Sequence, residues 1–227
     1  MKIVCVSDTH GMIKQAGFPQ GDVLILAGDI LKNYVRNPLL DAFQQEAGLR
    51  ELDAFVKTLG FKHVLMIAGN HDWLFERNKS AIQLAKNIIY LQDKEIVIDG
   101  VKFYGTPWQP EFCGWAFNLP RKGAKLRRVW ENIPNDVNVL ITHGPPWGIL
   151  DKIDPNGTDH LSRDVEPLGC ELLKERVEEL KSLKLHTFGH IHGSYGQTTI
   201  DGVVYLNASL CDEGYQPVNP PQMIEIS

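Results

Sequence analysis

The stretch HVLMIAGNHDW, His63 to Trp73, joins a run of apolar residues directly to a cluster of polar ones. Val64 to Ala68 suit a buried β-strand, because a strand covered on both faces reads as a continuous apolar run. Asn70, His71 and Asp72 follow immediately after the turn glycine. Burying an amide, an imidazole and a carboxylate is unfavourable unless they face polar partners. The stretch therefore predicts a buried strand that leads into a functional site.

Four other apolar runs lead into polar residues in the same way. The polar residues are Asp8 and His10 after Lys2–Ser7, Asp29 after Asp22–Gly28, His143 in Val137–Gly144, and His190 with His192 in Leu183–Gly193. Loops that leave the carboxyl ends of strands form the ligand sites of layered α/β folds. If the five strands share a sheet, their polar ends meet at one edge, and we expect a single site built from all five motifs.

The rest of the chain predicts a mixed α/β fold. Leu39–Leu59 carries an apolar stripe at helical spacing and precedes Gly60, a typical helix stop. Asp-Gly pairs at Asp99 and Asp201 lie between strand-like runs, a strong hairpin signal. The other expected elements are a loop over Thr106–Pro120, a short helix from Leu126 to Ile133, a helix over Pro167–Leu180 and a last strand in Pro221–Ser227. We expect one domain over residues 1–227, with stacked sheets flanked by helices.

The composition excludes several classes of protein. With 227 residues and 43% hydrophobic content, the chain suits one compact domain with a large core. A net charge of −5 provides no basic surface for a stable nucleic-acid complex. No apolar run is long enough to span a membrane, and the amino-terminal residues lack the features of a secretory signal. The four cysteines are scattered without a CxxC pair, which predicts reduced thiols in a cytoplasmic protein; they are Cys5, Cys113, Cys170 and Cys211.

The polar strand ends supply carboxylate, imidazole and amide groups but no thiolate. This ligand set suits Mn, Fe, Zn, Co or Ni. A single catalytic zinc needs only three protein ligands, and this chain offers more candidates than that: Asp8, His10, Asp29, Asn70, His143, His190 and His192. The surplus indicates two ions, which at a separation of about 3.5–4 Å stabilise both the attacking and the leaving oxygen in a displacement at phosphorus. One carboxylate has to bridge such a pair, and we expect it to be Asp29.

Each motif taken alone has a plainer interpretation. Asp8 and His10 alone are typical of a helix cap, and His143 alone is compatible with an ordinary loop histidine. His190 and His192 are stronger evidence, because alternate residues of an extended segment point to the same side. The combination of five motifs in this order is what favours a metal site.

Taken together, the motifs resemble those of the calcineurin-like metallophosphoesterase superfamily. That pattern is DxH, GD, GNH[DE], a His-Gly pair and GHxH, and every part is present, beginning at Asp8, Gly28, Gly69, His143 and Gly189. Segments of the second half, among them YGTPWQPEFCGWAFNLPR and LITHGPPWGILD, resemble the metallophosphodiesterase-domain (MPPED) proteins and their bacterial relatives. Some members of that group lack the first histidine of GHxH, which weakens metal binding, whereas His190 is present here.

The resemblance implies an α/β fold, a four-layer α/β/β/α sandwich of two mixed β-sheets flanked by helices. It also implies a division of the ligands, with Asp8, His10, Asp29 and His192 on one metal and Asp29, Asn70, His143 and His190 on the other. His71 would then face the substrate and protonate the leaving group, and Asp72 would hold the ring of His71.

The implied function is hydrolysis of small phosphodiesters by attack of a metal-bridging hydroxide. Cyclic nucleotides, including 2′,3′-cyclic ones, are the candidate substrates. Two divalent transition-metal ions are the expected cofactors, with Mn²⁺ preferred and Fe, Zn, Co or Ni as alternatives. The loop Thr106–Pro120 contributes four aromatic rings, which either stack on a nucleobase or pack the loop onto the body, the commoner fate; they are Trp108, Phe112, Trp115 and Phe117.

Two alternatives stay open at this point. A phosphomonoesterase or protein phosphatase would use the same metals and the same His71. A nucleotide-binding scaffold with low activity is a non-enzymatic alternative, against which the intact His71 and His190 argue. A metallo-β-lactamase-type hydrolase is excluded, because its HxHxDH run is absent.

Overall fold

The structure, a computed structural model, describes residues 1–32, 38–153 and 167–226, without the side chains of residues 38–41 and 79. Its helices are α1 Pro38–Thr58, α2 Trp73–Arg77, α3 Ala124–Glu131 and α4 Glu171–Glu179, with short 3₁₀ turns η1 Ile13–Gln15, η2 Lys79–Leu84 and η3 His192–Ser194. Its strands are β1 Lys2–Val6, β2 Val23–Ala27, β3 His63–Ile67, β4 Ile89–Tyr90, β5 Lys94–Ile98, β6 Val101–Thr106, β7 Gln109–Pro110, β8 Asn118–Leu119, β9 Val139–Thr142, β10 Leu185–Phe188, β11 Gly196–Ile200, β12 Val203–Asn207 and β13 Gln222–Glu225. None of the helices in the described part is both long and apolar enough to cross a membrane.

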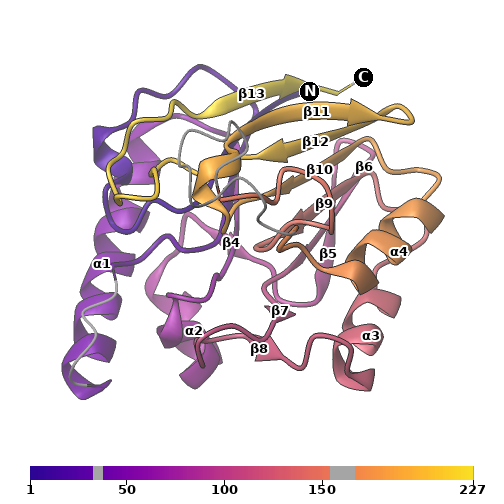
Figure 1. The fold of residues 1–227 in the computed structure, drawn as a ribbon. Helices are drawn as coiled ribbons and strands as arrows, with labels where there is room; N and C mark the ends of the chain where they lie inside the picture. Colours follow the sequence, from indigo (N-terminus) through magenta and orange to yellow (C-terminus); the bar gives the residue numbers. More distant parts are fainter. Residues whose placement is uncertain (33–37, 154–166, 227) are drawn as a thin grey trace.

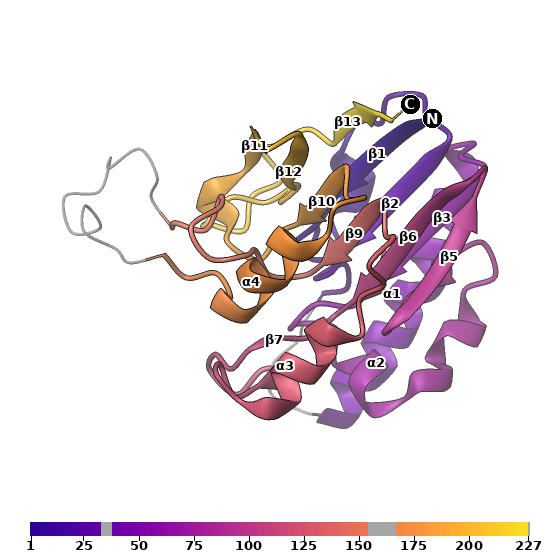
Figure 2. The same cartoon turned by 90° about the vertical axis from the view of Figure 1, so that its right-hand side faces the viewer.

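Two mixed β-sheets form the body of the molecule (Figure 1). One has five strands in the order β13-β1-β2-β3-β4, and the other has six in the order β11-β12-β10-β9-β6-β5. The pairs β1·β13, β5·β6 and β11·β12 are antiparallel, and the other pairs in these two sheets are parallel. Both termini lie at the same end of the five-stranded sheet, because β13 runs beside β1 (Figure 2).

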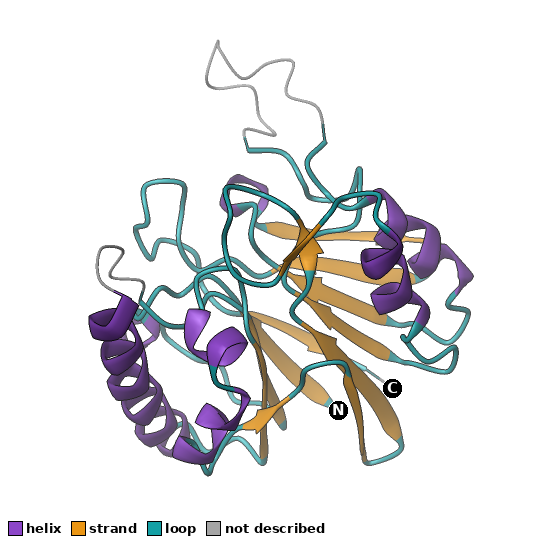
Figure 3. Ribbon diagram, turned by 90° about the horizontal axis from the view of Figure 1, so that it is seen from below, coloured by secondary structure: helices purple, strands orange, loops and turns teal. Residues whose placement is uncertain are grey.

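The two sheets pack against each other, and helices cover their outer faces. Figure 3 shows the strands of both sheets in the middle of the molecule and helices on either side. The core between the sheets contains Ile25 and Ile67 from one sheet and Phe103 and Ile141 from the other. A second core lies under α1 and α2 on the five-stranded sheet, and a third lies under α3 and α4 on the six-stranded sheet. The predicted four-layer α/β/β/α sandwich is therefore confirmed.

Both predicted hairpins are confirmed. Asp99 and Gly100 join β5 to β6 with φ angles of 48° and 80°, and Asp201 and Gly202 join β11 to β12 with φ angles of 50° and 82°. Two consecutive left-handed residues are what the type I′ turn of a two-residue hairpin requires, and Asp-Gly supplies them at low cost. These turns set the register of the outer strands in the six-stranded sheet.

The helix predicted over Pro167–Leu180 begins only at Glu171, so its predicted start was wrong. The residues before it bind the preceding loop instead, since the N–H of Gly169 donates to the carboxylate of Asp151 at 2.9 Å. Gly169 also lies so close to Pro146 that a β-carbon there would be 2.5 Å from a backbone oxygen of Pro146. Contacts with a distant loop therefore hold this segment out of the helix, and helical spacing alone does not reveal them.

The aromatic arm, as we call Thr106–Pro120, is less irregular than predicted, because β7 and β8 pair within it. Two of its rings pack the arm onto the body. Phe117 is fully buried, and the indole N–H of Trp108 donates to the carboxylate of Asp93 at 2.9 Å. The plainer of the two interpretations thus holds for Trp108 and Phe117.

The five polar strand ends do not share one sheet, which was the condition for expecting them to meet at one edge. β1, β2 and β3 belong to the five-stranded sheet, whereas β9 and β10 belong to the six-stranded sheet. The two groups still meet, because the sheets are joined at that end. The N–H of Ser7 donates to the carbonyl of Ala208, and its carbonyl accepts from the N–H of Leu210, both at 2.8 Å. This bridge brings the end of β1 next to the end of β12.

Candidate metal centre

Four of the predicted ligands have a left-handed backbone. The φ angles are 50° at Asp8, 44° at His10, 53° at Asp29 and 69° at His190. Such a conformation costs a non-glycine residue about 1–3 kcal/mol and persists only where the surroundings impose it. Here the N–H of Asp8 donates to the carbonyl of Gly28 at 2.9 Å, and the N–H of His10 donates to the carbonyl of Asp29 at 3.0 Å. Strain of this kind concentrates at functional sites, which supports a ligand site at these strand ends.

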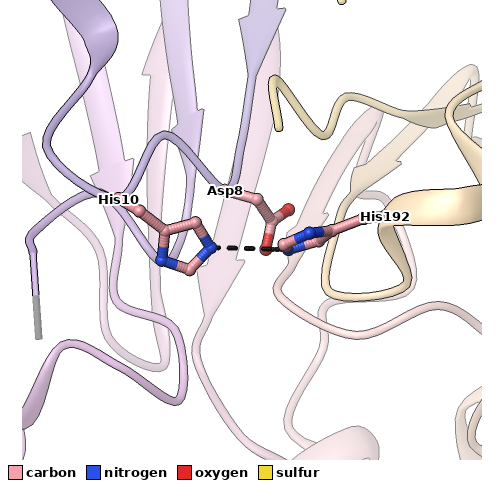
Figure 4. A group of neighbouring side chains, drawn as sticks. All are labelled: Asp8, His10 and His192. Carbon is pink, nitrogen blue, oxygen red and sulfur yellow. Dashed lines mark hydrogen bonds and ion pairs between the residues drawn. The ribbon is translucent and has the colours of Figure 1, made fainter. Parts of the chain in front are cut away.

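The first cluster of ligands joins the two ends of the chain. Asp8, His10 and His192 each place one ligand atom within 4.8 Å of the others. Nε2 of His192 lies 3.3 Å from a carboxylate oxygen of Asp8 and 3.4 Å from Nε2 of His10 (Figure 4). Nδ1 of His192 must carry a proton, because its partner at 2.9 Å is the carbonyl oxygen of Asp212. Nε2 is thereby left free to bind a metal.

The second cluster lies between the sheets. Ligand atoms of Asp8, Asp29 and His143 lie within 4.8 Å of one another. Nε2 of His143 is 2.8 Å from the amide oxygen of Asn70, and its Nδ1 is 3.1 Å from the carbonyl of Ala27. That carbonyl can only accept, so Nδ1 again carries the proton and Nε2 faces the other ligands. Asn70 thus lies beside His143, with which it would share a metal in the predicted ligand division.

Asp29 takes part in two clusters. Its carboxylate groups with Asp8 and His143 on one side and with His10 and His71 on the other. One of its oxygens lies 3.4 Å from Nε2 of His143 and 3.9 Å from Nε2 of His71. A position between both groups is what a bridging ligand needs, so the geometry fits the role expected for Asp29.

His190 and His192 do not point to the same side as alternate residues of a strand. The positive φ of His190 turns the chain, and η3 begins at His192. The ring of His190 lies beside that of His143, with centroids 5.0 Å apart, whereas His192 contacts Asp8 and His10. The argument from an extended segment was therefore wrong. The turn separates the two rings, in keeping with the ligand division that the resemblance implies.

The donors present fit divalent transition-metal ions. The side chains of Asp8 and Asp29 are 0% and 2% exposed, and buried carboxylates need cationic partners. Burial by itself raises the pKa of each carboxyl group, but His192 and His143 outweigh it and lower the pKa values of Asp8 and Asp29. Burial by itself lowers the pKa values of His192 and His143, but the neighbouring carboxylates outweigh it and raise both values to about 9. Metal ions would take over the charge that these two imidazolium protons carry in the metal-free protein.

Metal binding is therefore expected to release protons. At neutral pH, His143 and His192 are protonated in the metal-free protein because their pKa values are raised to about 9, and a metal binds only the deprotonated ring. The apparent affinity for Mn²⁺ should consequently rise with pH until about pH 9 and level off above it. Roughly two protons should leave per fully loaded chain, measured by calorimetric titration in buffers of different ionisation enthalpy. An affinity that is constant between about pH 6 and about pH 8 would contradict this.

Asp72 does not hold the ring of His71, contrary to the prediction. Its carboxylate accepts three backbone N–H groups, from Gly69 at 2.8 Å, Leu31 at 2.9 Å and Ile30 at 3.3 Å. It therefore ties the loop after β3 to the loop after β2, and so places Asn70 and Asp29 relative to each other. Its role is to position the predicted ligands.

His71 lies at the edge of the candidate ligand clusters, where it faces a cavity. Its backbone N–H donates to the carboxylate of Asp29 at 2.7 Å, and its side chain is 12% exposed. The centroid of its ring is 4.3 Å from that of Trp115 and 4.9 Å from that of His10. This placement is compatible with proton donation to a bound substrate.

The residues that support the ligands were missed from sequence. Oγ of Ser209 lies 2.9 Å from the carboxylate of Asp8 and 2.8 Å from Oδ1 of Asn207. The buried amide of Gln45 donates to the carbonyl of His71 at 2.8 Å. Asn207 ends β12 and Ser209 follows it, much as polar residues follow the strands of the five recognised motifs, so this signal was available. Gln45, one of the glutamines in α1, gave no such signal in the sequence.

A cavity of about 540 Å³ opens over the site. Asp29, Asn70, His71, His190 and His192 form its polar floor. Most of the remaining lining is apolar and comes from the aromatic arm and from the loops next to α4 and β12; it includes Pro110, Phe112, Trp115, Pro145, Leu168 and Tyr215. Four of the candidate metal ligands thus line a cavity of the size of a small molecule: Asp29, Asn70, His190 and His192.

Known proteins resemble this chain over most of its length. Residues 1–194 match the family model for calcineurin-like phosphoesterases. Metallophosphoesterase domain-containing protein 1 of Homo sapiens and that of Mus musculus are each 36% identical to it, over 99% of this chain and 71% of their own. A UPF0046 protein of Caenorhabditis elegans is 33% identical, over 95% of this chain and 72% of its own. One solved crystal structure superposes with a TM-score of 0.62 at 19% identity, over 91% of this chain and 89% of that one, which supports the fold.

The matched residues contain all the predicted ligands, from Asp8 to His192. The clusters of carboxylates and imidazoles lie where the two sheets meet, beneath an accessible cavity. This chain belongs to the calcineurin-like phosphoesterase family, a family of metal-dependent phosphoesterases.

Proposed function

We propose that this protein hydrolyses small phosphodiesters with two divalent transition-metal ions, for which Mn²⁺ is the expected metal. The candidate substrates are nucleoside cyclic phosphates, including 2′,3′-cyclic ones, which combine one phosphodiester with one planar base. The observation that carries the proposal is the cavity of about 540 Å³ over Asp29, Asn70 and His71. It has the size of a small-molecule site and offers apolar and aromatic surface beside the candidate metal ligands.

The charges around the cavity favour a phosphodiester over a phosphomonoester. Glu111 and Glu213 line it together with Asp29. The arginine in the described lining is Arg121, whose guanidinium already donates to two backbone carbonyls at 2.7 Å and to the carboxylate of Glu171 at 2.8 Å. A phosphodiester carries one negative charge, whereas a phosphomonoester carries between one and two at neutral pH. Away from the metal ions, which would bind the phosphoryl oxygens of either ester, the additional charge would meet Glu111 and Glu213 and no unpaired arginine or lysine of the described lining.

Exposed aromatic rings at the cavity support a substrate with a planar base. Phe112 is 57% exposed and Tyr215 is 47% exposed, and both line the cavity. The ring of Phe112 lies 6.2 Å from that of His190, and the ring of Tyr215 lies 4.8 Å from that of His10. Stacking on such rings is worth about 1–3 kcal/mol per base in single-strand binders, and it would hold the base while the phosphate faces the metal ligands.

The chain's own groups supply proton transfer and orientation. When bound, the metal ions provide Lewis-acid activation of water and of the phosphoryl oxygens. His71, in its protonated form, gives a ring proton to the leaving oxygen as the bond from phosphorus to that oxygen breaks. Asn70 would bind one metal ion together with His143, whose Nε2 lies 2.8 Å from the amide oxygen of Asn70. The apolar lining excludes bulk water, which strengthens these polar interactions.

A comparison of bis-p-nitrophenyl phosphate with p-nitrophenyl phosphate tests the proposal. On the Mn²⁺-loaded protein we expect kcat/KM for the diester to exceed that for the monoester by about tenfold or more, equivalent to ~1.4 kcal/mol. Nucleoside 2′,3′-cyclic and 3′,5′-cyclic phosphates, followed by chromatography of the products, then test the substrate class. Preference for the monoester would identify a phosphomonoesterase, and binding without turnover would identify a nucleotide-binding scaffold.

A cytoplasmic location is the second part of the proposal. All four cysteines are free, and the thiol of Cys113 is exposed, which is typical of a reducing compartment. Fractionation of cells that express a tagged chain tests this, and recovery from a secreted or periplasmic fraction would overturn it.

A further inference from the structure

The imidazole of His71 lies against an indole instead of a carboxylate. The carboxylate of Asp72 is occupied by backbone N–H groups, and the nearest oxygen of Asp29 lies 3.9 Å from Nε2 of His71, beyond hydrogen-bond distance. The indole of Trp115 is tilted by 30° against the imidazole, with the centroids 4.3 Å apart. On the basis of the proposed function, we propose that Trp115 is a positioning residue that orients His71 for proton transfer to the leaving group.

Trp115 is itself fixed to the segment that carries His71. The N–H of Ala116 donates to the carbonyl of Asn70 at 3.2 Å, and the N–H of Phe117 donates to the carboxylate of Glu76 at 2.7 Å. Both Ala116 and Phe117 are 0% exposed. The aromatic arm is thus bound to that segment on both sides of the imidazole, and the fold sets the position of the indole.

Ring packing restricts the side-chain rotation of His71 further. The ring of His10 meets it edge-on, with centroids 4.9 Å apart and planes at 84°, and the ring of Tyr215 lies 6.3 Å away. Aromatic pairs at such separations favour defined offset or edge-to-face arrangements. Proton transfer is sensitive to placement, since an error of about 1 Å in a reacting group costs about 10²-fold in rate. Loss of the indole should therefore lower the rate, because the imidazole of His71 would be less well oriented toward the leaving group.

The test compares leaving groups. Methyl aryl phosphates with leaving groups from p-nitrophenol to unsubstituted phenol are hydrolysed by the Mn²⁺-loaded wild-type protein, Trp115→Ala, Trp115→Leu, Trp115→Phe and His71→Ala. A poorly acidic phenol needs the proton more than p-nitrophenol does. We expect the hydrolysis rates of Trp115→Ala and Trp115→Leu to fall about 10²-fold on the phenol ester and little on the p-nitrophenol ester. His71→Ala should show the same selectivity. Trp115→Phe, which keeps an aromatic face, should restore most of the rate.

Trp108→Ala is the matched control. It removes an indole from the same arm, but Trp108 bonds to Asp93 and does not line the cavity. It should lower the rates on both esters by the same factor. If Trp115→Ala fails to fold, the comparison is made with Trp115→Leu and Trp115→Phe, because both keep most of the volume of the side chain at position 115.

A magnetic resonance measurement gives a readout that does not depend on turnover. In the metal-free protein, which lacks paramagnetic Mn²⁺, the ring current of the Trp115 indole should shift the Cε1–H resonance of His71, which is assigned by its loss in His71→Ala. The shift should disappear in Trp115→Leu and persist in part in Trp115→Phe. If His71→Ala is selective for poor leaving groups and the Trp115 variants are not, the inference is wrong while the proposed function stands. If His71→Ala is not selective either, the proton-donor role fails and the inference fails with it.

Discussion

Replacing Asp29 with asparagine is expected to lower kcat/KM for bis-p-nitrophenyl phosphate by about 10³-fold or more, corresponding to ~4 kcal/mol. Asp29 belongs to two ligand clusters, and asparagine keeps its shape while removing its charge. The bound metal should fall from two ions per chain toward one, measured by elemental analysis after gel filtration. The amide oxygen can still accept the N–H of His71, which in the wild type donates at 2.7 Å, so the loop after β3 should keep its position.

Asp22→Asn is the control for Asp29→Asn. Asp22 stands just before the same strand, β2, but its carboxylate pairs with Lys62 on the surface at 3.0 Å. This variant should keep its metal content and its activity. An Asp29→Asn protein with two bound ions and undiminished activity would show that Asp29 is not the bridging ligand.

Replacing His71 with alanine is expected to lower kcat/KM by about 10²–10⁴-fold for diesters with alkoxide leaving groups, the usual contribution of general acid catalysis. The loss should be much smaller for bis-p-nitrophenyl phosphate, because nitrophenolate leaves without a proton. Since His71 is predicted to face the substrate and not to bind metal, the variant should retain both ions. Rates on a nucleoside cyclic phosphate and on the nitrophenyl diester, with metal analysis of the same samples, check this expectation.

His63→Ala is the matched control for His71→Ala. His63 begins the strand that His71 follows, β3, at the opposite end from the cluster. Its loss should leave both rates unchanged. Equal losses on the two substrates in His71→Ala would contradict the proton-donor role, and a parallel loss of metal would instead place His71 among the ligands.

The positions of the candidate ligands could be predicted from sequence because the relevant signals are local. Each ligand directly follows an apolar run, as Asp29 follows β2 and His143 follows β9. The Asp-Gly hairpins at Asp99 and Asp201 could be predicted for the same reason, since two adjacent residues determine the turn. The fold class followed from the succession of these elements, together with the family resemblance.

The roles of individual side chains could not be predicted where they depend on distant backbone. Asp72 appeared to be a partner for His71 because it is adjacent in sequence, yet its carboxylate is taken by N–H groups of Ile30 and Leu31. His190 and His192 have the spacing of strand neighbours, but the left-handed backbone at His190 separates them. In both cases tertiary contacts decide the local conformation, and residue type and spacing do not report them.

The bridge between Ser7 and Ser209, which joins the two sheets beside the ligands, has a consequence for the order of maturation. The cluster of Asp8, His10 and His192 draws on both ends of the described chain. Strands β1 to β3 are consecutive in the sequence and paired in the sheet, so they can pair before the rest of the chain is made, whereas the cluster requires His192. A nascent chain therefore carries only part of the ligand set, and it has no means of selecting a metal pair until the second sheet has docked. We therefore expect the complete ligand set, and with it the binding of two metal ions, to form only late in the folding of a newly made chain.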